Sequence, residues 1–170
     1  SALLSAIVLY GFGVPQKTQK LNQKTAQIVY HAISEPQGQE LYHQEEIAWV
    51  GEFFNAFSEE INHSTVHFTY ANAAMLKSQS MHYSGDLPVS EDEIVVQEAF
   101  LDDLGYSNKL GQTIQIPFSD GTMHEFKLTG ILDVKTGDIG RYTAIISKEL
   151  AEQQSGNNMV MDYYIGLKNA

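Results

Sequence analysis

The chain of 170 residues carries 21 acidic and ten basic side chains, a formal net charge of −11, and contains no cysteine. The lack of cysteine excludes disulfide frameworks, zinc–thiolate sites and thiol nucleophiles. The negative charge repels phosphate backbones and anionic lipid headgroups, which argues against nucleic-acid binding. The length is that of one domain, or of two small subdomains that share a core.

The charge is not evenly distributed. The first acidic residue is Glu35, and the few charged residues before it are all lysines. This step in composition predicts a boundary near residues 25–34. We therefore expect residues 1–24 to be an apolar leader and residues 25–170 to be the folded domain.

An almost uninterrupted apolar run extends from Leu3 to Val14. As a helix it would be about 18 Å long, which is short of the roughly 30 Å that a membrane span needs. It is either a buried strand or short core helix, or the outer end of a transmembrane helix, where Tyr10 and Phe12 would suit the interfacial aromatic belt. We favour the second interpretation, although lysines beyond a span are more typical of its cytoplasmic side.

Strands and short helices alternate in the first half of the expected domain. β-Branched and aromatic residues predict strands, and Ser34 with Gln37 three residues later predicts a capping box at the start of a helix. The expected elements are a strand over residues 26–33, a helix from Ser34 to about Gln44, an extended segment over 47–57, a turn at 62–64, a strand over 66–70 and a helix over 71–77.

The second half of the domain continues in the same way. Gly105 stands where a helix C-cap needs a residue at positive φ, and Ser119-Asp120-Gly121 is a hairpin signal. The expected elements are strands over residues 93–96, 111–117, 125–132, 143–146 and 159–167, with helices over 97–104 and 148–153. The pattern predicts an α+β domain with a mixed sheet, built from strand–helix–strand units and β-hairpins.

The sequence shows no set of residues with the spacing of a catalytic or metal-binding site. His63 and His67 have the spacing of a helical chelate, but along a strand four residues span roughly 13 Å, too far to share one ion. The acidic pairs diverge in either regular structure and match no calcium loop. Nucleophile and phosphate-loop motifs are missing from the sequence. We therefore predict no catalytic residues, no metal and no cofactor.

An aromatic-rich stretch is the strongest candidate for a contact surface. Six aromatic residues fall within 22 positions of one another: Trp49, Phe53, Phe54, Phe57, Phe68 and Tyr70. Such residues on paired strands usually form core. Phe53 and Phe54 are adjacent and cannot face the same side of a strand, so we take Phe53, Phe54 and Phe57 as partner-contact candidates.

Five short motifs follow one another between Gly85 and Leu132. They are Gly85-Asp86-Leu87-Pro88, Glu93-Ile94-Val95-Val96, Leu104-Gly105, Leu110-Gly111-Gln112-Thr113-Ile114 and Phe126-Lys127-Leu128-Thr129-Gly130-Ile131-Leu132. In this order and spacing they resemble the second half of the MacB-like periplasmic core domain found in MacB/FtsX-type permeases of ABC transporters. The resemblance covers roughly residues 85–147.

The resemblance implies a domain outside the cell membrane, between the first two transmembrane helices of a permease. Such permeases act as homodimers or permease pairs with a cytoplasmic ATPase, and they export or extract substrates or transmit ATP-driven motion to outside partners. The family has no catalytic residues in this domain, so an enzyme is not expected. Both ends of the folded domain should then lie close together on one face.

Two other classes compete with this interpretation. A stand-alone secreted binding or adhesion domain would have its own signal peptide, whereas a permease needs further hydrophobic spans; the full-length gene distinguishes them. A small hydrolase would need convergent polar groups that the sequence does not indicate.

Overall fold

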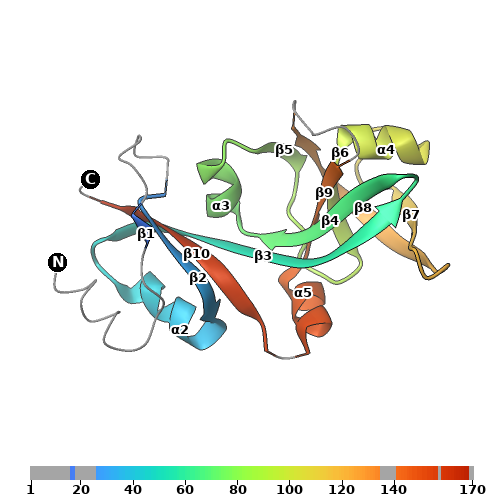
Figure 1. The fold of residues 1–170 in the computed structure, drawn as a ribbon. Helices are drawn as coiled ribbons and strands as arrows, with labels where there is room; N and C mark the ends of the chain where they lie inside the picture. The colour runs from blue at the N-terminus through green and yellow to red at the C-terminus, as the bar shows by residue number, and fades with distance from the viewer. Residues whose placement is uncertain (1–15, 18–25, 135–140, 157, 169–170) are drawn as a thin grey trace. The chain divides into compact units, whose positions relative to one another are not determined.

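The computed structural model describes residues 16–17, 26–134, 141–156 and 158–168 (Figure 1). The chain forms two compact units: unit 1 comprises residues 1–54, 71–80 and 158–170, and unit 2 comprises residues 55–70 and 81–157. Most of the expected leader over 1–24 lies outside the described residues. The domain boundary near residue 25 therefore stays a prediction.

Unit 1 is built from strands at both ends of the described chain. Its elements are β1 (Gln16–Lys17), β2 (Ile28–Ser34), α2 (Glu35–Gln39), the 3-10 helix η1 (Glu40–His43), α3 (Ala73–Ser78) and β10 (Val160–Leu167). Two further strands, β3 (Ile47–Ile61) and β4 (Ser64–Ala71), have residues in both units.

Unit 2 holds the segment that resembles the permease domain. Its elements are β5 (His82–Gly85), β6 (Glu93–Gln97), α4 (Glu98–Leu104), β7 (Thr113–Pro117), β8 (Met123–Asp133), β9 (Arg141–Ile146) and α5 (Lys148–Ser155). Across the described residues the strands are hydrogen-bonded in the order β1-β2-β10-β3-β4-β9-β6-β8-β5, and β7 also pairs with β8. The sheet is mixed, because β4 with β9 and β6 with β8 are parallel pairs. The α+β prediction is confirmed.

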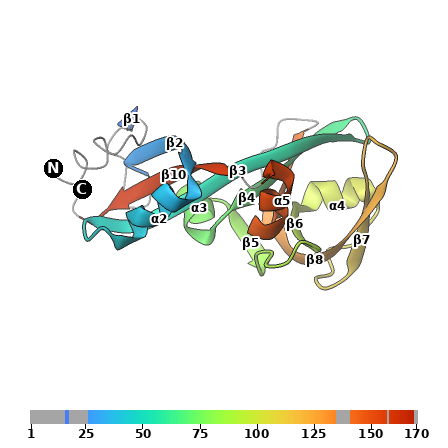
Figure 2. The same cartoon turned by 90° about the horizontal axis from the view of Figure 1, so that it is seen from below.

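In unit 1, β10 lies between β2 and β3 and is antiparallel to both (Figure 2). Alternate residues of β10 are buried on one face, namely Met161, Tyr163 and Ile165. Helix α2 packs on β2 and β10. Gly38 permits this close approach, because a Cβ at that position would overlap the Tyr163 ring.

The start of α2 differs in detail from the expected capping box. Ser34 is the N-cap residue and Pro36 lies in the first turn, as predicted. The Ser34 hydroxyl, however, donates to Oε1 of Gln37 (2.9 Å) and accepts no backbone N–H. The two side chains of the predicted box therefore bond each other. The remainder of the expected helix, up to about Gln44, is the 3-10 helix η1.

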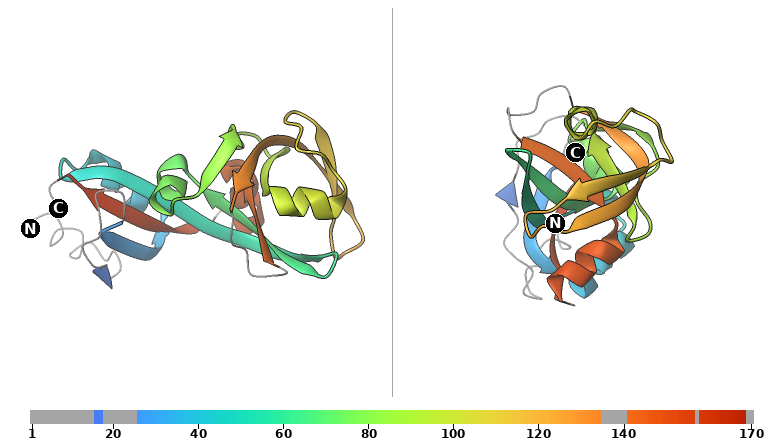
Figure 3. Two further views of the ribbon diagram at one scale, coloured as in Figure 1. Left: turned by 90° about the horizontal axis from the view of Figure 1, so that it is seen from above. Right: turned by 90° about the vertical axis from the view of Figure 1, so that its right-hand side faces the viewer.

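In unit 2, β6 has partners on both sides, β8 and β9. Its residues Ile94, Val95 and Val96 are completely buried, which explains a continuous apolar run in place of an alternating one. Helix α4 follows directly and contacts β6 and β8 (Figure 3). It ends at Gly105, whose φ of 82° is the left-handed cap predicted from the sequence.

Tight turns close both hairpins of unit 2. Asn62 and His63 between β3 and β4 have positive φ values of 50° and 65°, as a type I′ turn requires. Gly121 has a φ of 84° in the turn between β7 and β8, at the predicted position. Strand β5 was not among the predicted elements; its residues pair antiparallel with the end of β8.

Candidate contact site

The first two contact candidates, Phe53 and Phe54, lie in the unit 1 part of β3, and both are half-buried. Phe53 is paired in the sheet with Asp162 of β10. Successive side chains of a strand point to opposite faces, so each face of β3 presents a partly accessible ring here. Both side chains are thus partly packed and partly accessible, so each could still contribute to a contact surface.

The third candidate, Phe57, belongs to an aromatic cluster in unit 2. Its ring is stacked on Phe68 with a centroid distance of 4.6 Å and lies 5.8 Å from Phe118. Phe118 in turn stacks on the exposed His124 at 3.8 Å. Since Phe68 is fully buried while Phe57 and Phe118 are half-buried, the cluster runs from the core to the surface.

A hydrogen-bonded turn holds this cluster together. The backbone N–H and the hydroxyl of Ser119 both donate to the Glu59 carboxylate, the first over 3.0 Å. Asp120 accepts from the N–H and hydroxyl of Thr122, and these bonds lower the pKa of its carboxyl group. The turn is thus fixed beside Phe57 by contacts that no local sequence signal indicated.

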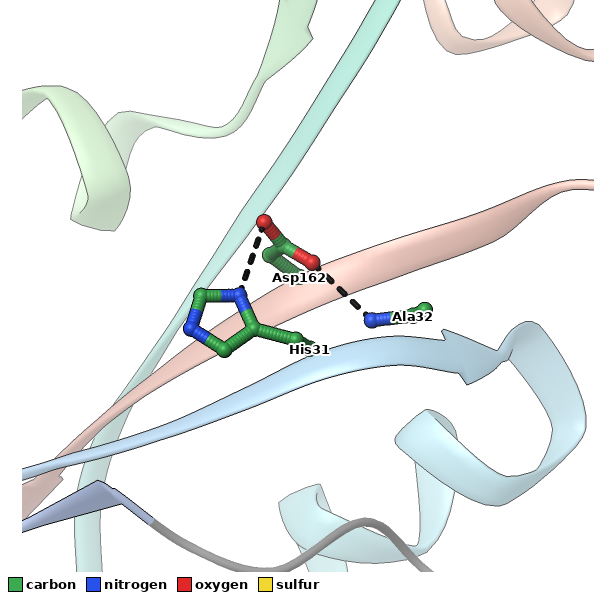
Figure 4. Close-up of polar contacts among 3 residues, drawn as sticks. All are labelled: His31, Ala32 and Asp162. Atoms are coloured by element: carbon green, nitrogen blue, oxygen red, sulfur yellow. Dashed lines mark hydrogen bonds and ion pairs between the residues drawn. The ribbon is translucent and has the colours of Figure 1, made fainter.

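Histidine and aspartate meet in unit 1. Nδ1 of His31 lies 3.2 Å from Oδ2 of Asp162, and the other oxygen of Asp162 accepts the backbone N–H of Ala32 (3.0 Å) (Figure 4). No local sequence signal indicates this pair, because β2 and β10 are at opposite ends of the chain.

The remaining candidates for metal ligands stay apart. His67 is bonded through Nδ1 to the Ser58 hydroxyl (2.7 Å), and His63 lies in the β3–β4 turn. Within residues 16–17, 26–134, 141–156 and 158–168, no three histidine or acidic side chains are placed to hold a metal ion.

A polar cluster around the buried Glu52 in unit 1 was not predicted. Glu52 of β3 is only 5% exposed and accepts a hydrogen bond from the Tyr42 hydroxyl. Asn72 accepts the Glu52 backbone N–H (3.0 Å) and donates to the Val50 carbonyl (3.0 Å). The cluster ties η1 and the start of α3 to β3.

The raised pKa values of Tyr42 and Tyr163 argue against proton transfer by these two hydroxyl groups near neutral pH. Burial, followed by the hydrogen bond and negative charge of Glu52, raises the pKa of Tyr42 well above its ordinary value. Burial, with the charge of Glu52 as a smaller cause, also raises the pKa of Tyr163. A general acid or base works best with a pKa near the operating pH, which neither hydroxyl approaches.

The start of β2 and the end of β10 lie next to each other in unit 1. The Gln27 N–H donates to the Ile165 carbonyl (2.8 Å), and the Leu167 N–H donates to the Gln27 side chain. Lys168 N–H then donates to the Glu46 carbonyl (3.0 Å). Residue 25 lies outside the described residues. Gln27 directly precedes β2, and Lys168 directly follows its neighbouring strand β10.

None of the described helices is long and apolar enough to cross a membrane. The apolar run from Leu3 to Val14 is outside the described residues.

Comparison with known proteins finds similarity in structure alone. No protein-family model and no curated protein matches the sequence. The extracellular domain of the noncanonic ABC-type transporter YknZ from Gram-positive bacteria is similar, with a TM-score of 0.58 at 10% identity over 82% of this chain and 75% of that one. The periplasmic region of MacB from Actinobacillus actinomycetemcomitans gives 0.57 at 13% identity, over 82% and 67%.

A third similar structure is a domain assigned to a permease protein from Porphyromonas gingivalis. Its TM-score is 0.59 at 10% identity, over 89% of this chain and 79% of that one. The chain therefore has the α+β fold of the extracellular and periplasmic domains of MacB/YknZ-type ABC transporter permeases. The fold implied by the five motifs is confirmed.

Proposed function

We propose that the chain is the non-catalytic extracytoplasmic domain of an ABC transporter permease, and that it couples ATP-driven motion to export, substrate extraction or an outside partner. The observation that carries the proposal is the shared fold with three transporter domains over more than four-fifths of the chain. Fold alone permits many functions, so the geometry of the site has to agree with it.

The ends of unit 1 support insertion between two membrane helices. A domain inserted in this way must receive and return the chain on one side. Gln27 and Leu167 are hydrogen-bonded to each other, so the start of β2 and the end of β10 lie side by side. Flanking transmembrane helices, a second permease copy or partner permease, and a cytoplasmic ATPase complete the proposed transporter.

A labelling experiment tests the location. The chain has no cysteine, and Val89 is 83% exposed in the loop before β6. We replace Val89 with cysteine in the full-length protein, with any other cysteines of that protein removed, and treat intact cells with a membrane-impermeant maleimide. Labelling of a protein that sediments with membranes is expected. Labelling only after permeabilisation would refute the proposal, and labelled protein in the medium would favour a secreted domain.

We also propose that Phe53, Phe54 and Phe57 contribute to the contact with the outside partner. All three rings are half-buried, which leaves part of each accessible to a partner. The support is weaker for Phe57, because its ring is stacked on Phe68. A photoreactive amino acid at position 54 of the full-length protein should cross-link to a single second protein. The matched control is the same substitution at Val160, an exposed position on β10. Equal cross-linking from both positions would remove Phe54 from the contact surface.

A further inference from the structure

Two residues of β2 lie opposite one residue of β10. Ser34 pairs with Val160 and Ile33 with Met161, whereas Tyr30 already pairs with Tyr163. His31 and Ala32 therefore share the single partner Asp162, which is the arrangement of a β-bulge.

The bulge corrects a mismatch between the two apolar patterns. On β10 the large buried side chains are two apart, at 161, 163 and 165. Their partners on β2 are Ile28, Tyr30 and Ile33, so the last interval is three residues long. Without the extra residue Ala32 would enter the core and Ile33 would turn to solvent, because a one-residue shift exchanges the faces of a strand.

Asp162 bonds both residues of the bulge. Oδ1 accepts the N–H of Ala32, which the bulge removes from the regular ladder, and Oδ2 lies 3.2 Å from Nδ1 of His31. Ala32 needs this support, since its φ of 54° is a conformation that residues other than glycine rarely adopt. One carboxylate thus stabilises the backbone at the point where the pairing would otherwise be free to shift.

We propose that Asp162 is a register clamp between β2 and β10. By holding His31 and Ala32 in the bulge it fixes the register in which Ile33 is buried and α2 starts after Ser34. Loss of the carboxylate allows the end of β2 to slip by one residue, so that Ala32 pairs with Met161.

The clamp also gives the proposed function a physical basis, and this part rests on that proposal. The segments before β2 and after β10, at Gln27 and Lys168, are the ones that would lead to the membrane helices of the proposed permease. With a fixed register the two strands transmit force as one body. With a slipping register, part of any displacement would be lost between them.

Amide hydrogen exchange on the 170-residue chain tests the clamp. In Asp162→Ala we expect exchange at Ala32 to be faster by about tenfold or more, which is the effect of losing a hydrogen bond to a charged group. We also expect a cross-strand nuclear Overhauser effect between Ala32 and Met161. In Asp162→Asn, which keeps an oxygen acceptor, most of the protection at Ala32 should remain.

Two further variants separate the clamp from general loss of stability. His31→Ala removes the pair with the imidazole but keeps the bond to Ala32 N–H, so exchange at Ala32 should stay within about twofold of the parent. Ala32→Gly in the Asp162→Ala background should make the slip less favourable, because glycine accepts a positive φ, so the cross-strand signal between residue 32 and Met161 should weaken although the N–H of residue 32 has no acceptor. Equal exchange at Ala32 in the parent and in both Asp162 variants would overturn the proposal.

The proposed transmission of force between β2 and β10 is tested separately, by measuring transport. In the complete transporter, Asp162→Ala should lower the amount of substrate moved per ATP hydrolysed, and His31→Ala should not. Unchanged transport together with a slipped register would refute force transmission while leaving the clamp intact. Cytoplasmic labelling of Val89→Cys would refute the proposed function without touching the exchange result.

Discussion

At the scale of single residues, positions without a side chain determine how closely elements pack. Helix α2 can lie on β10 because Gly38 has no Cβ, and the Trp49 ring covers Gly166 for the same reason. The Tyr163 ring beneath Gly38 is completely buried, so it has no free space into which to move. The two positions are intolerant of even one added carbon atom.

We therefore expect Gly38→Ala to destabilise the protein by about 1–3 kcal/mol, the usual effect of overpacking, despite the higher helix propensity of alanine. Urea denaturation measures the free energy of unfolding. The control is Gln39→Ala, the next residue of the same helix, which should change the stability by less than about 0.5 kcal/mol. A Gly38→Ala protein as stable as this control would contradict the packing argument.

At the scale of elements, α3 and α5 both begin with a side-chain cap, but the two caps differ in how many other hydrogen bonds they make. Asn72 accepts the Met75 N–H at the start of α3 (3.0 Å) and also bonds Glu52 and Val50 of β3. Ser147 at the start of α5 accepts only the Leu150 N–H (3.1 Å). The first cap is therefore part of the tertiary structure, whereas the second serves its helix alone.

Replacing each cap by alanine should show this difference. Asn72→Ala is expected to lower the free energy of unfolding by about 2–3 kcal/mol, because it loses a cap and leaves the backbone of buried Glu52 without its acceptor. Ser147→Ala should cost about 1 kcal/mol. Equal losses in thermal or urea unfolding would show that Asn72 acts only as a cap.

A carboxylate also holds the loop before β6. Glu93 accepts the N–H groups of Val89 (2.7 Å) and Ser90 (3.2 Å), and these bonds lower the pKa of its carboxyl group. A lowered pKa in the folded state stabilises the protein above the ordinary carboxyl value. That contribution is lost as the pH falls through the lowered value.

Glu93→Gln should therefore be less stable than the parent at neutral pH, and the difference should shrink as the pH falls below about 4. Urea midpoints between pH 7 and pH 3 measure it. Glu125→Gln, the same substitution at an exposed position on β8, is the matched control. A pH-independent difference for Glu93→Gln would contradict the assigned bonds.

Prediction from the sequence succeeded where the signal was local and failed where it was not. The strand at residues 93–96, the cap at Gly105 and the turn at Gly121 follow from composition over a few residues, and all are confirmed. Strand β5 was missed because its four residues are short and polar, and their pairing depends on β8. The site was harder to predict, since Phe57 meets Phe118 only in the folded chain.

At the scale of the whole molecule, the expected leader contributes little described structure. Only Gln16 and Lys17 of residues 1–24 are described, as the two-residue strand β1 paired with β2. A chain without residues 1–24 should fold and melt within about 3 °C of the full chain, since the step in charge and apolar composition predicts that the folded domain begins near residue 25. Circular dichroism on heating measures this. A truncated chain that is unfolded at 25 °C would show that the leader belongs to the core.

Long separations in sequence also govern how the protein is made. Ala32 and its bonding partner Asp162 are 130 residues apart. At ribosomal rates of about 5–20 residues per second, β2 therefore waits on the order of ten seconds for β10 to be synthesised. Unit 2 ends at residue 157, before β10, so its residues are all synthesised before the partner of β2 is. We therefore expect unit 1 to close last, and until then Val29 and Tyr30 of β2 lack their partners on β10 and are exposed to aggregation.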